Sequence, residues 1–167
     1  MTRLITSIDD ARALEGEEVG LSDWIVIDQN RIDEFAEATT DYQWIHVDTE
    51  RAKRELPTGK TIAHGYLTLS LIPALTGNFV DIRNLVRAIN FGVNKVRFYT
   101  PVNAGDRVRA RAKVLQARRR AGALMLTSET RIEVEGERKP ACVAETLGMY
   151  FFEEQLDDEA APSARQA

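Results

Sequence analysis

Residues 62–77, "IAHGYLTLSLIPALTG", are apolar on nearly every side of the helix that their spacing predicts. A helix that is apolar all round is stable when other elements cover it, so this segment limits what the rest of the chain can form. We expect the helix to run from Gly65 to Leu75 and to lie in the centre of the fold.

The part of the chain after Asn84 has a different period. Polar and apolar residues alternate through residues 106–114 ("DRVRARAKV") and 124–134 ("LMLTSETRIEV"), and residues 141–152 ("ACVAETLGMYFF") complete the set. Alternation predicts half-buried strands, and glycine or proline between them predicts tight turns. About four long antiparallel strands are expected, and the apolar face of their sheet must pack against another element. The central helix is apolar enough for this, so the sequence predicts an α+β fold with an antiparallel sheet around that helix.

The first third of the chain predicts shorter elements. A strand is expected around residues 22–27 ("SDWIVI"), and Asp28 can cap a helix that continues through Thr39. A second short helical segment is expected at residues 49–56 ("TERAKREL"), before a proline and a glycine. The chain therefore predicts one strand, then helices, then the long strands.

Composition predicts one domain over residues 1–152, while the acidic and then small residues 153–167 predict a disordered tail. A net charge of −4 does not suggest nucleic acid as a partner. No segment approaches the roughly 18 apolar residues of a membrane span, so we expect no membrane association. Cys142 is the single cysteine, which favours a reducing compartment and a cytoplasmic location.

The chain has two histidines, His46 and His64, and no cysteine near them in sequence, so we expect neither a metal ion nor another cofactor. Asp41 and His46 bracket the segment "DYQWIH" between two predicted helices. A loop can bring their side chains together, and an imidazole beside a carboxylate can activate water. Alternatively, Asp41 caps a neighbouring helix and His46 is a hydrogen-bonded polar residue at the edge of the core.

Gly65 precedes the apolar helix, whose first amides have no acceptor within the helix and carry a partial positive charge. Such amides can hold an oxygen atom that gains negative charge during a reaction. A glycine there can equally serve close packing of the helix. Arg118, Arg119 and Arg120 form a positive cluster in a predicted turn, which suits a phosphate or a solvated hairpin.

Two segments together, "FAEATTDYQWIHVDTERA" and "GKTIAHGYLTLSL", resemble the MaoC-like dehydratases, which include the (R)-specific enoyl-CoA hydratases, and most closely the nodulation protein N branch. The later segments "NKVRFYTPVNAGDRVRARAKV" and "KPACVAE" fit the same branch. The resemblance covers roughly residues 10–152. It implies the hotdog fold, a homodimer with an acyl-thioester tunnel near the subunit interface, and an acyl-CoA or acyl carrier protein thioester as the substrate.

The resemblance implies a catalytic aspartate at Asp41, a catalytic histidine at His46 and an oxyanion-binding amide at Gly65. The reaction implied is addition of water across a trans-2-enoyl thioester, or the reverse dehydration of a (3R)-hydroxyacyl thioester. Further contacts with the substrate are expected from residues that flank these groups, namely Gln43, Trp44, His64 and Tyr66.

The chain departs from the family pattern at three positions. Gln43 and Trp44 stand where the family has asparagine and proline, and proline fixes its own backbone angle whereas tryptophan does not. Pro73 stands where the (R)-hydratases have a serine, so a hydroxyl group is absent there. Two other functions remain open from the residues: a hotdog acyl-CoA thioesterase, and a non-catalytic subunit that binds acyl thioesters.

Overall fold

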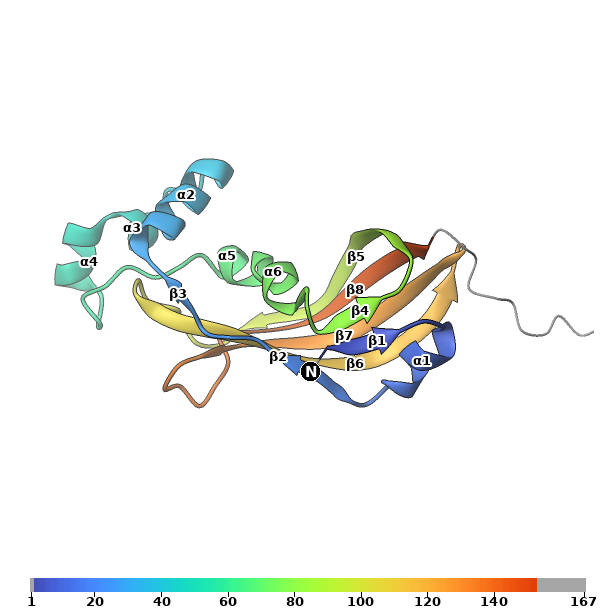
Figure 1. The fold of residues 1–167 in the computed structure, drawn as a ribbon. Helices are drawn as coiled ribbons and strands as arrows, with labels where there is room; N and C mark the ends of the chain where they lie inside the picture. The colour runs from blue at the N-terminus through green and yellow to red at the C-terminus, as the bar shows by residue number, and fades with distance from the viewer. Residues whose placement is uncertain (1, 153–167) are drawn as a thin grey trace, which may run out of the picture.

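The computed structural model describes residues 2–152, so the predicted tail at 153–167 lies outside the described residues. The largest element of the fold is one twisted sheet with strand order β2-β6-β7-β8-β5, in which β3 also pairs with β6 (Figure 1). The four long strands are antiparallel to their neighbours, which confirms the antiparallel sheet. Their bounds and those of the short strands are β2 Glu18–Leu21, β3 Ile25–Ile27, β5 Leu85–Phe98, β6 Asp106–Arg120, β7 Ala123–Val134 and β8 Cys142–Phe152.

Alternation in the sequence becomes two different faces of the sheet. On β6, Val108, Ala110, Ala112 and Val114 are all buried, whereas the arginines between them point outward. The outward arginines pair with the next strand, since the Arg109 and Arg111 guanidinium groups each contact the Glu133 carboxylate of β7, at 2.7 and 2.8 Å. Glu133 lies directly opposite Arg109 in the sheet. One face is therefore core and the other a charged surface.

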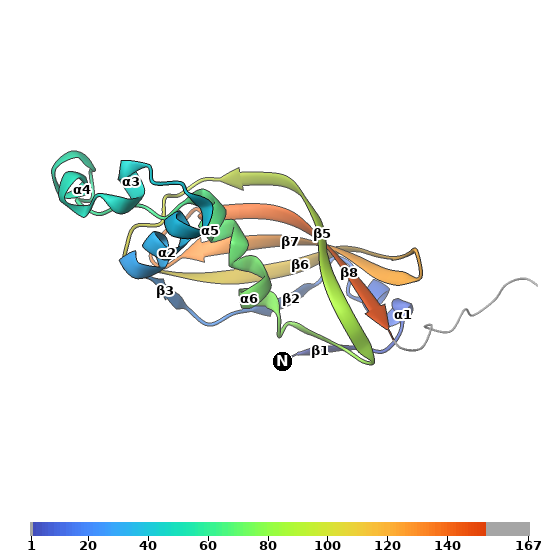
Figure 2. The same ribbon diagram turned by 90° about the horizontal axis from the view of Figure 1, so that it is seen from above.

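The central helix is present but is divided into two. Helix α5 (Gly65–Ser70) and helix α6 (Ile72–Thr76) lie end to end on one face of the sheet (Figure 2). The prediction of one continuous helix from Gly65 to Leu75 is wrong because Pro73 lacks an N–H group and its ring collides with the carbonyl of the preceding turn. The helices bury Leu67, Leu71, Ile72 and Leu75 against the sheet.

The central helix is also not covered on every side within one chain. Tyr66 is 71% exposed, and Pro73 is exposed as well. A single sheet can cover only the side of a helix that faces it. The apolar residues on the opposite side are thus available to another surface.

Three helices form a lobe beyond one end of the sheet: α2 (Gln29–Thr39), α3 (Trp44–Val47) and α4 (Thr49–Glu55) (Figure 1). Asp28 caps α2 as predicted, because its carboxylate accepts a hydrogen bond from the Arg31 amide at 2.9 Å. The lobe also contains a helix that the sequence did not predict, the four-residue α3, which carries His46.

The N-terminal residues form elements that sequence patterns did not indicate. Strand β1 (Arg3–Ile5) pairs in parallel with β4 (Val80–Ile82), and helix α1 (Ile8–Ala13) starts at a capping box made by Ser7 and Asp10. Segments of three to six residues are too short to show a period. No helix within residues 2–152 has both the length and the apolar character needed to cross a bilayer.

Candidate active site

His46 lies on α3 with its side chain buried and its main chain fixed from two sides. The Gln29 side-chain amide donates a hydrogen bond to the His46 carbonyl at 2.8 Å, and the Ile62 amide donates to the neighbouring Ile45 carbonyl at 3.0 Å. Its Nδ1 lies 2.6 Å from the Ile62 carbonyl oxygen. A carbonyl can only accept, so Nδ1 carries the hydrogen and Nε2 is left as an acceptor in the neutral ring.

The surroundings of His46 keep this ring neutral. Burial is the largest cause and lowers the pKa of His46 below its ordinary value of 6.5. The bond to the Ile62 carbonyl and the charge of Asp41 raise the pKa, while the nearby His64 lowers it. The net lowering means that His46 has an unprotonated Nε2 at neutral pH, as a general base needs.

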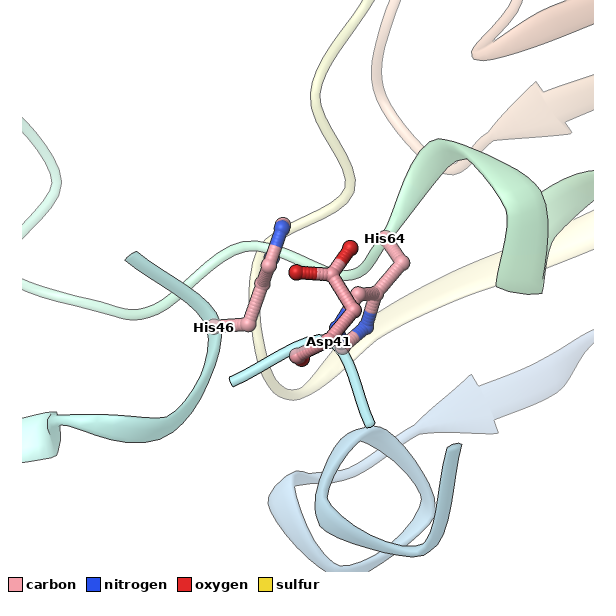
Figure 3. A group of neighbouring side chains, drawn as sticks. All are labelled: Asp41, His46 and His64. Carbon is pink, nitrogen blue, oxygen red and sulfur yellow. The ribbon is translucent and has the colours of Figure 1, made fainter. Parts of the chain in front are cut away.

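Asp41 lies in the segment between α2 and α3, and its carboxylate is brought to His46. One polar side-chain atom of each of Asp41, His46 and His64 lies within 4.8 Å of those of the other two (Figure 3). The Asp41 carboxylate also accepts a hydrogen bond from the main-chain N–H of Gln43 at 3.4 Å. Helix α4 is capped by Asp48 instead, which accepts a hydrogen bond from the Arg51 amide, so Asp41 is free of the capping role that was its alternative.

His64 completes the group from the start of α5. Its imidazole stacks on that of His46, with ring centroids 3.8 Å apart and an interplanar angle of 26°. Its Nε2 lies 2.9 Å from the main-chain carbonyl oxygen of Asp41. The ring is 2% exposed, so it lies behind the pair rather than on the open side.

Asp41, His46 and His64 also form a group whose side-chain ligand atoms lie close enough together to hold a metal ion. Two histidines and a carboxylate are a ligand set that iron enzymes use. Each imidazole already directs one nitrogen at a main-chain carbonyl. That leaves one ring nitrogen of each histidine to bind a proton or a metal ion.

Gly65 is the first residue of α5, and its surroundings leave little room for a larger side chain. A Cβ atom there would lie 3.2 Å from the Phe98 ring of β5. Tyr66, the next residue, meets the same ring edge-on at a centroid distance of 6.1 Å and is largely exposed. The start of α5 therefore lies against the Phe98 ring and directly follows His64 in the chain.

Gln43 and Trp44, which replace the asparagine and proline of the family pattern, begin α3. Gln43 is exposed and is the residue at which the helix starts; its carbonyl accepts a hydrogen bond from the His46 amide at 2.9 Å. The Arg51 guanidinium lies 4.0 Å from the centre of the Trp44 ring. A cation on an aromatic face is a stabilising contact, and this one joins α3 to α4.

Gln29 was not predicted from the sequence, although its side-chain amide binds the main chain of His46. Besides the His46 carbonyl, its side chain contacts the buried Thr61 hydroxyl and the Asp33 carboxylate. Thr61 is 32 positions away along the chain, so no local pattern could signal the contact.

A groove of about 610 Å³ runs beside α5 and α6, between these helices and strands β5 and β8. Its lining is mostly apolar and includes Leu69, Ile72, Pro73, Thr76, Val93 and Tyr150. Leu69 lies one helical turn beyond Gly65, so the groove begins close to the start of α5. An extended apolar chain fits a lining of this kind.

The arginine cluster lies far from these residues within one chain. Arg118, Arg119 and Arg120 end strand β6 at the hairpin to β7, at the opposite end of the sheet from the lobe of α2 to α4 (Figures 1 and 2). The Arg120 guanidinium lies 4.6 Å from the centre of the Phe91 ring.

Comparisons with known proteins agree with this architecture. Residues 10–136 match the family model described as MaoC like domain. The chain is 47% identical over 149 residues to 3-hydroxyacyl-thioester dehydratase Z of Mycobacterium tuberculosis, covering 89% of this chain and 98% of the relative. It is 42% identical over 149 residues to nodulation protein N of Rhizobium leguminosarum bv. viciae, covering 88% and 92% of the two chains.

Among solved structures, the R-hydratase PhaJ1 from Pseudomonas aeruginosa superposes with a TM-score of 0.67 at 21% identity, covering 92% of each chain. The monoamine oxidase regulatory protein of Archaeoglobus fulgidus superposes with a TM-score of 0.70 at 24% identity, covering 90% of this chain and 98% of that one. These likenesses confirm the predicted hotdog fold. By the family match and the identity to its relatives, the chain belongs to the MaoC-like dehydratases.

Proposed function

We propose that the protein is a hydro-lyase that adds water to a trans-2-enoyl thioester and, in reverse, dehydrates a (3R)-hydroxyacyl thioester. The observation that carries the proposal is the pairing of the Asp41 carboxylate with His46, whose Nε2 is an unprotonated acceptor. The name of its relative with 47% identity, a 3-hydroxyacyl-thioester dehydratase, supports the same reaction. The (3R) hand of the product is carried over from the resemblance to the (R)-specific hydratases.

In this mechanism a water molecule is held between Asp41 and His46. One of these two side chains accepts a proton from the water while the oxygen of the water attacks C3 of the enoyl thioester. The electron pair of the C2–C3 double bond moves toward the thioester, and negative charge develops on the oxygen at C1. The accepted proton is then returned to C2, so the base and the acid are regenerated as a pair. Dehydration follows the same steps backwards.

The oxygen at C1 is assigned to the Gly65 amide. That amide is at the start of a helix, where the N–H has no acceptor within the helix. Removal of one donor of this type in other enzymes slows reactions by roughly 10²–10³-fold. The residue type fits the role, because a side chain at Gly65 would press on the Phe98 ring.

The acyl chain is assigned to the groove beside α5 and α6. A thioester whose carbonyl lies at Gly65 can extend its acyl end past Leu69 toward Thr76, along the apolar lining. Tyr66 follows Gly65 directly on α5, and Gln43 and Trp44 begin the helix that carries His46; these three residues remain the proposed substrate contacts.

Replacing Thr76 with tryptophan is expected to narrow the groove and to select against long substrates. The rate with dodecenoyl-CoA should fall by roughly tenfold or more, because an acyl chain that loses several buried methylenes loses about 0.8 kcal/mol for each. The rate with the four-carbon crotonyl-CoA serves as the internal control and should change little. Initial rates with both substrates test this; equal losses for both would contradict the assignment of the groove.

We also propose that the protein is a homodimer that pairs through β5. This strand is at the end of the sheet, and its side chains are exposed along almost its whole length, including Ile89, Phe91, Val93 and Phe98. A long apolar edge with unpaired main-chain groups is a template for another strand. A second copy of the same strand offers a self-complementary surface, as two-fold dimers require.

Replacing Val93 with lysine is expected to weaken that dimer, because each copy of β5 would bring a charge to the shared edge. Val26→Lys is the matched control, since Val26 lies on β3 and is 50% exposed, against 49% for Val93. Light scattering after size exclusion should give about twice 18.8 kDa for the parent and the control, and a mass nearer 18.8 kDa for Val93→Lys at low concentration. A dimer of unchanged stability in Val93→Lys would place the interface elsewhere.

Hydration is separated from the thioesterase alternative by its products. Loss of the enoyl absorbance of crotonyl-CoA without release of free CoA thiol supports the hydratase, and release of thiol with the double bond intact would refute it. Binding of crotonyl-CoA without either change would indicate the non-catalytic subunit. We also propose a cytoplasmic location, which a chain with a single cysteine favours.

A further inference from the structure

His64 is the last residue before α5, and its side chain is enclosed. The ring is 2% exposed; Phe35 of α2 contacts it with centroids 5.1 Å apart, and His46 of α3 stacks on it. The imidazole is therefore wedged between the two helices that flank Asp41.

One nitrogen of His64 ties that segment to the start of α5. Nε2 lies 2.9 Å from the Asp41 carbonyl oxygen, which is 23 positions earlier in the chain. Because the carbonyl can only accept, Nε2 is the donor. The bond fixes the main chain of the residue whose carboxylate reaches His46.

The other nitrogen of His64 has no partner. Nδ1 is buried and makes no hydrogen bond within residues 2–152. A buried unpaired acceptor is unfavourable, and an apolar side chain of similar size would fill the same space without that cost. An imidazole at this position contributes two contacts: the Nε2 donor and the ring face that stacks on His46.

We propose that His64 is a positioning residue that aligns both members of the Asp41–His46 pair, the carboxylate through the Nε2 bond and the imidazole through ring stacking. The inference rests on the proposed function. The groups that face the His46 ring are the Ile62 carbonyl, the Asp41 carboxylate and the His64 ring, and the last also contributes to the lowered pKa of His46.

Three variants separate the two contacts. His64→Gln keeps an amide donor near the position of Nε2 and loses the ring, His64→Phe keeps the ring and loses the donor, and His64→Ala loses both. We expect kcat for crotonyl-CoA to fall roughly tenfold to hundredfold in His64→Ala, as displacements of about 1 Å do in other enzymes, and to fall less in the other two. KM should change little, because the ring lies behind the pair. Ile132→Val, a change at a fully buried position near the end of β7, controls for a general loss of stability.

The histidine NMR signals provide a readout that needs no substrate. The chain has two histidines, so any imidazole signal in a His64 variant belongs to His46. We expect the titration midpoint of His46 to rise and its nitrogen shifts to change in His64→Phe and His64→Ala, and to stay constant in Ile132→Val.

The outcomes are distinct. A raised KM with unchanged kcat would make His64 a substrate contact and overturn the inference, as would a loss of kcat matched by Ile132→Val at equal stability. Unchanged His46 signals in all three variants would overturn it too. If the parent protein lacks hydratase activity but the His46 signals change as expected, the proposed function fails while the positioning of the pair by His64 stands.

Discussion

Replacing His46 with alanine is expected to lower kcat for hydration of crotonyl-CoA by roughly 10²–10⁴-fold, the contribution that a positioned general base makes. The reason is structural: the bond to Ile62 leaves Nε2 as the one nitrogen of His46 that can accept a proton from water. The loss should appear in kcat more than in KM, because this interaction strengthens as the reaction proceeds. Initial rates over a range of substrate concentrations measure both.

Glu50→Ala is the matched control for His46→Ala, since Glu50 lies on the adjacent helix α4 with an exposed side chain. It should retain the parent rate. Circular dichroism and thermal unfolding show whether His46→Ala remains folded, because the change also removes a buried hydrogen bond. A folded His46→Ala protein with the parent rate would rule out His46 as the base.

Changing Asp41 to asparagine is expected to reduce the same kcat by roughly 10²–10⁴-fold. Asparagine has the shape of aspartate and can still contact the Gln43 amide, but it carries no charge and cannot accept a proton at neutral pH. Since Asp41 is exposed, the melting temperature should stay close to that of the parent protein. The experiment therefore tests the charge of the carboxylate while the surrounding structure is kept.

Asp9→Asn makes the same chemical change on an exposed carboxylate of α1 and should leave the rate unaltered. In a protein that carries both Asp41→Asn and His46→Ala, the second change should add little to the first, because the two groups act on one water molecule. If kcat of the double variant fell by the product of the two single losses, Asp41 and His46 would act in separate steps.

Strand positions and faces could be predicted from the sequence because alternation is a local pattern. Leu124, Leu126, Ile132 and Val134 lie on one parity of the alternating segment 124–134, and all four are buried in β7. The break between α5 and α6 could have been foreseen from Pro73 alone, since proline interrupts a helix wherever its ring meets the preceding turn.

Strand β1 and helix α1 could not be predicted in the same way. Their stability comes from partners that are distant in sequence: β1 pairs with β4, and Ala11 of α1 belongs to the main core. Tertiary contacts of this kind override weak local preference.

The same distinction applies to the site. Asp41 and His46 are five positions apart in one segment, so their meeting could be proposed from sequence, and the family resemblance made it specific. The contacts that hold them, from Gln29 to the His46 carbonyl and from His64 to the Asp41 carbonyl, join positions 17 and 23 apart. Nothing in the local sequence of either partner indicates those bonds.

Addition of water to C3 of an enoyl thioester can be followed with labelled water. Crotonyl-CoA is incubated with the protein in H₂¹⁸O, and the products are separated on a chiral phase and analysed by mass spectrometry. We expect (3R)-hydroxybutyryl-CoA with the label in the C3 hydroxyl group and the thioester intact. Label found instead in a free carboxylate, with CoA released, would contradict it.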